Sequence, residues 1–152
     1  MIESKPGAAR MFVRKGTSVL MVHSLAFYPN PSPWEISGGG VKKKRNESGE
    51  QAAIRECEEE TGCVCTEVKH RFNVVYNEGE ISEWHVAVFE AIKFTEPPVL
   101  TFDPEELDGV GWIEETALQE LWISDESQLI LGGFGLLLTP PEIQHRGILY
   151  PV

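Results

Sequence analysis

Long hydrophobic runs are missing from this sequence. The longest apolar stretch, residues 129–138, has ten residues and is broken by three glycines, whereas a transmembrane helix needs about 20 apolar residues. The first six residues also lack the apolar segment of a secretory signal peptide. We therefore expect neither a membrane-spanning helix nor secretion.

Positive charge is scarce as well. The chain has 13 Lys and Arg residues and 24 Asp and Glu residues, which gives a net charge of −11. Proteins that bind nucleic acids or anionic membranes need clustered Lys and Arg, so we expect no strong nucleic-acid binding and no membrane association. Cysteine is limited to Cys57, Cys63 and Cys65. Their odd number and close spacing do not suit a disulfide framework and indicate reduced thiols in a cytoplasmic compartment.

The residues that are present fit a single globular domain over residues 1–152, of which 41% are hydrophobic. Two apolar runs, residues 8–14 and 17–24, flank Lys15-Gly16 and predict a β-hairpin. The proline-rich residues 29–33 cannot form a central strand, so they predict a loop.

Further strands are predicted on both sides of one central helix, which indicates an α+β domain. Residues 34–36 predict a short strand that leads into three glycines at 38–40. Those glycines allow either a close approach of the backbone to a ligand or a flexible turn. The later predictions are strands at 63–76 and 81–93 around a turn at Glu78-Gly79, a long loop at 95–108, a short strand at 110–113, and then helical structure that includes 129–138.

The central helix is the best specified element. Ser48 and Gln51 have the spacing of a capping box, in which each side chain satisfies the other residue's backbone amide. Gly62 stands where a glycine commonly ends a helix. The sequence therefore predicts a helix that begins after Ser48 and ends at Gly62.

Three carboxylates project from one face of that helix. Glu56, Glu59 and Glu60 are spaced i, i+3, i+4. Their mutual repulsion costs roughly 0.2–0.5 kcal/mol per pair, and acidic groups at a helix C-terminus also oppose the helix dipole. A divalent cation would reverse both effects, and oxygen ligands suit Mg²⁺ or Mn²⁺ better than Zn²⁺. The alternative is a solvated, Glu-rich helix face.

The residues around this cluster resemble the Nudix box, so the chain resembles the Nudix hydrolase superfamily and its MutT-like members. The matching positions are Glu47, Arg55, Glu56, Glu59, Glu60 and Gly62. This resemblance implies the Nudix α/β/α sandwich, with a mixed β-sheet and a catalytic loop–helix–loop. It also implies hydrolysis of a nucleoside diphosphate linked to another group, with Mg²⁺ or Mn²⁺ as the cofactor.

The resemblance also assigns expected roles to residues of this chain. Glu56, Glu59 and Glu60 would be metal ligands, together with the carbonyl of Gly38 or Gly39. Glu47 and Arg55 would be supports, with Arg55 orienting Glu59. A carboxylate from a later loop would act as a further ligand or as the general base; Glu106 is the first candidate and Glu105 the second. Either Glu56 or Glu106 would deprotonate the attacking water.

The loop before the central helix departs from the family pattern. Seven residues rather than five separate Gly39 from Glu47, and this longer loop contains Lys42, Lys43, Lys44 and Arg45. These cations would either contact substrate phosphates or form a solvated loop tip.

The candidates for stacking on a nucleobase are Trp34, Phe27, Tyr28 and Trp84, whereas Trp112 and Trp122 are expected in the core.

The leading hypothesis is a pyrophosphohydrolase that converts a (d)NTP or a related small nucleotide to a nucleoside monophosphate. Dinucleoside polyphosphates, nucleotide sugars and inositol pyrophosphates are alternative substrates, and the basic loop favours a phosphate-rich one. A Nudix-fold nucleotide sensor without catalysis and an acidic interaction domain of another fold are the alternatives from other classes. The expected protein is a monomer or homodimer in the cytoplasm.

Overall fold

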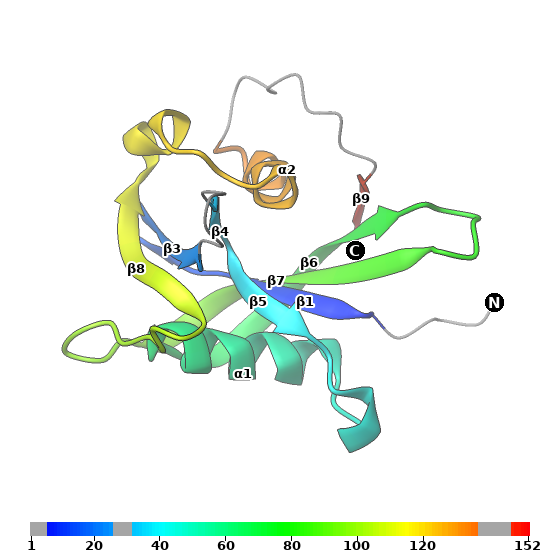
Figure 1. Cartoon of the computed structure of the whole chain (residues 1–152), viewed down its shortest axis with the longest axis horizontal. Coiled ribbons are helices and arrows are strands. Elements are labelled where there is room, and N and C mark those ends of the chain that lie inside the picture. Colours follow the sequence, from blue (N-terminus) through cyan, green and yellow to red (C-terminus); the bar gives the residue numbers. More distant parts are fainter. Residues whose placement is uncertain (1–5, 26–31, 137–146) are drawn as a thin grey trace.

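A mixed five-stranded β-sheet lies at the centre of this computed structural model, which describes residues 6–25, 32–136 and 147–152 (Figure 1). The strand order is β5-β1-β7-β6-β9, with β1 parallel to β7 and the other pairs antiparallel. The strands are β1 (Ala8–Phe12), β5 (Ser37–Gly40), β6 (Val64–Tyr76), β7 (Trp84–Thr95) and β9 (Gly147–Pro151).

A smaller sheet is built around β3 (Ser18–Ser24). This strand pairs antiparallel with β2 (Arg14–Lys15), β4 (Trp34–Glu35) and β8 (Leu107–Glu114). The 3₁₀ turn η2 (Glu115–Glu120) follows β8. The predicted hairpin is therefore confirmed for β2 and β3, whereas the first part of the same apolar run forms β1 in the larger sheet.

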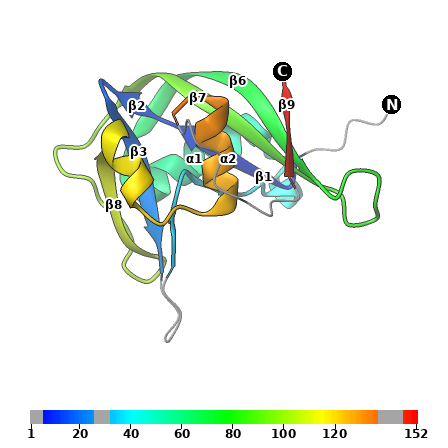
Figure 2. The same cartoon turned by 90° about the horizontal axis from the view of Figure 1, so that it is seen from above.

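Two helices cover opposite faces of the central sheet, as the views in Figures 1 and 2 show together. Helix α1 (Gly49–Thr61) lies on one face and α2 (Asp125–Gly133) on the other. Successive residues of β1 point to opposite faces of the sheet: Met11 packs in the core beside α1, and Phe12 packs in the core beside α2. This is the sandwich of helix, mixed sheet and helix that the resemblance to the Nudix superfamily implied.

Helix α1 begins and ends where its sequence predicts. The Ser48 hydroxyl accepts from the amide of Gln51 at 3.1 Å, and the Gln51 side chain accepts from the amide of Ser48 at 2.9 Å. At the other end Gly62 has φ = 81°, a left-handed conformation that favours glycine, and its amide donates to Glu58 O at 2.9 Å. The buried face of the helix carries Ala52, Ala53 and Cys57, so its charged face stays free for chemistry.

The glycines at 38–40, for which the sequence left a close approach to a ligand and a flexible turn open, form strand β5 together with Ser37, because their backbone pairs with β1. Two other sequence predictions are wrong in part. The C-terminal region is not helical throughout, since β9 adds to the edge of β6. Trp122 is 56% exposed, so it is not a core residue. The predicted helix at 129–138 is covered by α2 up to Gly133, and residues 137 and 138 lie outside the described residues.

Within the described ranges, no helix is both long enough and apolar enough to cross a membrane. The strand predicted at 63–76 is confirmed as β6, and the one predicted at 81–93 corresponds to β7, although residues 81–83 lie in the turn before it. The long loop after β7 is confirmed for residues 96–106, whereas residues 107 and 108 already belong to β8.

We expect Ser48→Ala to lower the free energy of unfolding by about 1 kcal/mol, because it removes one half of the capping box. Urea denaturation would measure the change. Ser82→Ala is the matched control, since Ser82 is exposed in the turn between β6 and β7 and its hydroxyl bonds to no described residue. Equal stability of the two variants would contradict the assigned cap.

Candidate active site

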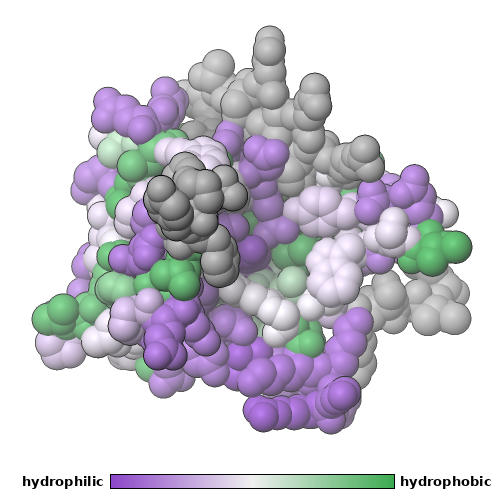
Figure 3. Space-filling model, viewed as in Figure 1, coloured by the Kyte–Doolittle hydropathy of each residue, from purple (hydrophilic) through white to green (hydrophobic). Residues whose placement is uncertain are grey.

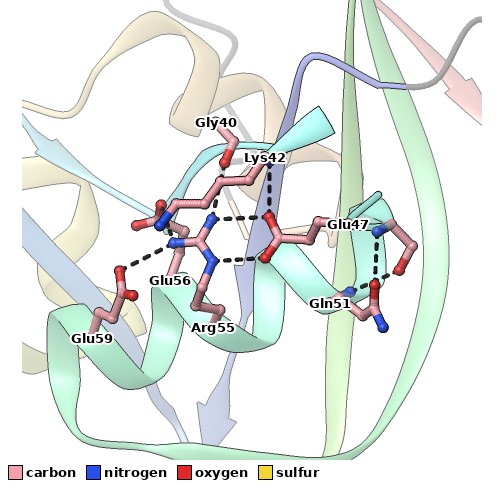
Figure 4. A network of polar contacts seen from close by, with 8 residues as sticks. Gly40, Lys42, Glu47, Gln51, Arg55, Glu56 and Glu59 are labelled. Carbon is pink, nitrogen blue, oxygen red and sulfur yellow. Dashed lines mark hydrogen bonds and ion pairs between the residues drawn. The ribbon is translucent and has the colours of Figure 1, made fainter. Parts of the chain in front are cut away.

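Arg55 is the centre of a network of carboxylates on α1 and the preceding loop (Figure 4). Its Nε and Nη2 donate to the two carboxylate oxygens of Glu47 at 2.7 and 3.0 Å. Its Nη1 donates to Glu56 at 2.9 Å and to Glu59 at 3.1 Å. Nη2 also donates to the carbonyl of Gly40 at 3.1 Å, so one guanidinium joins α1 to β5. The expected pairing of Arg55 with Glu59 is confirmed.

Glu47 fixes the loop that leads into α1. Its Oε1 accepts from the backbone amide of Lys42 at 2.9 Å, while both of its oxygens bind Arg55. The hydrogen bonds from Arg55 hold the pKa of Glu47 at about 2, well below its usual range. Glu47 is therefore ionised at neutral pH and serves as a permanent anionic brace between the loop and the helix.

The three glycines of β5 lie against two of the helix carboxylates. A Cβ on Gly39 would lie 2.7 Å from Cδ of Glu56, so only glycine lets this carboxylate approach the strand. The amide of Gly38 donates to Oε1 of Glu60 at 2.8 Å. The close approach that the glycines allow is thus made by the protein's own glutamates. The carbonyl used in this arrangement belongs to Gly40, which accepts from Arg55.

Glu60 is the carboxylate whose ionisation the fold changes most. Burial raises its pKa to about 8, although the hydrogen bond from Gly38 opposes this rise. The negative charge of Glu56 raises the pKa further, whereas the positive charge of Arg10 lowers it. A second cation near Glu56 and Glu60 would stabilise the ionised form of Glu60.

Sequence reasoning missed Arg10 of β1. Its Nη1 donates to the carbonyl of Ile36 at 2.8 Å, at the entry to β5, and its Nε donates to Glu126 of α2 at 2.7 Å. The Tyr76 hydroxyl donates to the other oxygen of Glu126 at 2.5 Å. A lone arginine inside an apolar strand is the signal that could have identified this buried contact.

The two later-loop candidates are not brought to the helix carboxylates. The Glu105 and Glu106 amides donate within a turn to Asp103, and both side chains are exposed. Among the described residues, neither side chain bonds to Glu56, Glu59 or Glu60. The loop does reach α1, because the Thr101 amide donates to the carbonyl of Thr61 at 3.3 Å.

The candidates for nucleobase stacking differ in their surroundings. Trp34 already stacks on His23, with ring centroids 4.8 Å apart. Trp84 is 47% exposed. Phe27 and Tyr28 lie outside the described residues.

The donor chemistry of this site fits a hard divalent cation. Glu56, Glu59 and Glu60 share one face of α1, and Glu60 has a raised pKa beside another carboxylate. Within residues 6–25, 32–136 and 147–152, no three His, Cys, Asp or Glu side chains are grouped to hold one ion. Instead, Arg55 holds Glu56 and Glu59, and Gly38 holds Glu60.

We expect Glu60→Gln to stabilise the metal-free protein at pH 8.5 but not at pH 5. The raised pKa means that the folded state binds more protons than the unfolded state between about pH 4.5 and 8. Stability from this group is therefore complete below pH 4.5 and is lost as the pH rises through 8. The gain at pH 8.5 should be at least about 1 kcal/mol.

Thermal unfolding in a chelating buffer would measure this gain. Glu58→Gln is the matched control, because Glu58 is exposed on the same helix and the substitution changes the net charge equally. If both variants gained the same stability at both pH values, general charge repulsion rather than the burial of Glu60 would explain the result.

Solved structures share this fold. A MutT NUDIX hydrolase from Burkholderia pseudomallei is 22% identical with a TM-score of 0.68, and the match covers 86% of this chain and 98% of that one. The NUDIX domain of Shewanella oneidensis NrtR, solved with ADP ribose, is 17% identical with a TM-score of 0.67 and 91% coverage of both chains. An Ap4A hydrolase from C. elegans is 18% identical with a TM-score of 0.59, covering 84% of this chain and 95% of that one.

No curated protein sequence matches this chain. A protein-family model does match: the NUDIX domain model aligns with residues 4–130, a span that includes the whole Arg55 network. The chain therefore belongs to the Nudix family, and it is a Nudix hydrolase, an enzyme of the class that acts on phosphoric anhydrides.

Proposed function

We propose that this protein is a divalent-metal-dependent pyrophosphohydrolase that cleaves a nucleoside diphosphate linked to another group and releases a nucleoside monophosphate. The observation that supports this proposal is the Arg55 network, which holds Glu56 and Glu59 on one face of a capped helix. A cluster of carboxylates is unfavourable without positive charge beside it. A phosphoric anhydride substrate is a polyanion that also needs positive charge, and a divalent cation held by the carboxylates would serve both.

Glu56, Glu59 and Glu60 are the residues that would hold the metal, with a carbonyl of Gly38 or Gly39. Bound Mg²⁺ or Mn²⁺ supplies positive charge that stabilises the phosphoryl oxygens and acidifies the attacking water. The protein's own task is positioning. Arg55 fixes two of the carboxylates, and the Gly38 amide fixes the third.

A general base must accept the proton of the attacking water. Glu56 lies inside the network, packed on Gly39 and bound by Arg55. Glu106 is exposed in a turn and would have to move with its loop. Glu56 is therefore the better placed of the two candidates for the base, in addition to its place beside Glu59 and Glu60 among the residues that would hold the metal.

The simplest substrate is a (d)NTP or a related small nucleotide. Two structural relatives are named for other nucleotide-type ligands, ADP ribose and Ap4A, so a longer leaving group is compatible with the fold. Dinucleoside polyphosphates, nucleotide sugars and inositol pyrophosphates are the alternative substrates. We expect the enzyme to act in the cytoplasm as a monomer or homodimer.

Glu59→Gln should lower kcat/KM by at least about 100-fold, because it removes a ligand oxygen charge while keeping the side-chain shape. The assay would follow product release from dNTPs, oxidised dGTP, ADP ribose, dinucleoside polyphosphates, UDP-sugars and an inositol pyrophosphate, with Mg²⁺ or Mn²⁺. Turnover should also stop when EDTA removes the metal.

Glu58→Gln serves as the control for this assay, since its carboxylate is exposed on the same helix and forms no ion pair with a described residue. It should retain the activity of the wild type. Binding of metal and nucleotide without turnover of any substrate would instead support the nucleotide-sensor alternative.

A further inference from the structure

A hollow of about 480 Å³ lies on the side of the molecule where the chain enters α1, and Lys42 in its lining is hydrogen-bonded to Glu47 of the Arg55 network. We call it the basic pocket. It is lined by Gly7, Val41, Trp84 and the basic turn, which consists of residues 42–45. Figure 3 shows hydrophilic side chains along the lower edge of the molecule, where α1 and the adjoining turn lie.

The basic turn is folded and tied to the active site. Its 3₁₀ turn η1 (Lys43–Arg45) ends at Asn46, which has φ = 55° and whose amide donates to Lys43 O at 3.0 Å. The backbone amide of Lys42 donates to Glu47, and Glu47 binds Arg55. The extra residues of this loop therefore form an ordered structure one hydrogen bond away from the network.

The side chains of the basic turn form no salt bridge with the described residues, although the positive charge of Lys42 helps to lower the pKa of Glu47. Lys42, Lys43, Lys44 and Arg45 are exposed, and none forms an ion pair with a described carboxylate. Other cations of the described chain do form such pairs, namely Arg10, Arg14, Lys15, Arg55, Arg71 and Lys93. Four adjacent unpaired cations in a chain of net charge −11 are suited to an anionic ligand.

Trp84 supplies a fixed aromatic surface in the same pocket. A Cβ on Gly7 would lie 2.2 Å from the Trp84 ring, so the indole packs directly on this glycine. Gly7 is itself held in place, because its amide donates to His85 O at 2.9 Å and its carbonyl accepts from Val41 at 3.0 Å. The ring nevertheless remains 47% exposed. Exposed aromatic rings beside cations are the combination on which nucleobases and their phosphates bind.

We propose that the basic pocket is a second nucleotide subsite, in which Trp84 stacks on a base and the basic turn binds the attached phosphates. Its occupant is the distal nucleotide of the substrate, which makes a dinucleoside polyphosphate the matching substrate class. This inference rests on the proposed function, since it identifies the group linked to the nucleoside diphosphate. Trp84, Lys43 and Lys44 are specificity-determining residues and leave the chemistry to the helix carboxylates.

Binding to the full chain in EDTA tests the subsite without hydrolysis. Titration calorimetry would compare diadenosine tetraphosphate with ATP. We expect the dinucleotide to bind about tenfold more tightly than ATP to the wild type. Trp84→Ala should weaken dinucleotide binding by about 5- to 100-fold and bring it to the level of ATP, whereas Trp84→Phe should keep most of the preference because it keeps a ring.

The paired substitution Lys43→Gln/Lys44→Gln should also weaken dinucleotide binding and reduce its dependence on salt. Its matched control is Lys69→Gln/Lys93→Gln, which removes the same charge from exposed positions of β6 and β7. Equal binding of the two nucleotides by the wild type would overturn the proposal. An unchanged preference in both Trp84→Ala and Lys43→Gln/Lys44→Gln would also overturn it.

Hydrolysis assays with Mg²⁺ separate this inference from the proposed function. In Trp84→Ala the KM for diadenosine tetraphosphate should rise by a larger factor than the KM for dNTPs. Turnover of dNTPs that is lost in Glu59→Gln, together with unchanged dinucleotide kinetics in Trp84→Ala, would uphold the hydrolase and overturn the subsite. A dinucleotide preference in EDTA without any turnover would uphold the subsite and overturn the hydrolase.

Discussion

The contact between Arg55 and Glu47 is the constraint on which the site depends. The guanidinium meets both oxygens of one carboxylate, a geometry that fixes direction as well as charge. Its remaining N–H group then reaches Glu56 and Glu59, and Gly40 completes the set. Loop, helix and strand β5 are therefore locked together by one side chain. A lysine could not replace it, because a single ammonium cannot hold these acceptors in one plane.

Local sequence signals were sufficient to predict the helix that carries this arrangement. Ser48, Gln51 and Gly62 specify its two ends through contacts within a few residues, so no knowledge of the rest of the chain was needed. The shared face of Glu56, Glu59 and Glu60 follows from helical geometry alone. The position of Arg55 beside Glu59 follows from the same spacing, and the structure confirms it.

Contacts between distant parts of the chain were not predictable in this way. The composition of residues 38–40 left a flexible turn open, yet these glycines form a strand because their backbone pairs with β1. The partners of Arg10 are Ile36, just before β5, and Glu126 of α2, which lie 26 and 116 residues away in the sequence. Strand β9 depends on pairing with β6 from the far end of the chain. Glu106 lies in a long loop, and the length of a loop does not determine where its side chains lie.

The acidic character of the chain and the anionic nature of its substrates are compatible because charge acts locally. At physiological ionic strength, exposed charges more than about 8 Å apart are largely screened, so the net charge of −11 has little influence inside the basic pocket. What matters there is how the nearby acids are used. Glu47 is the carboxylate nearest to the basic turn along the chain, and Arg55 binds both of its oxygens. The contact that orders the active site therefore occupies both oxygens of Glu47, and Lys43, Lys44 and Arg45 form no ion pair with a described carboxylate, which leaves them to bind phosphate.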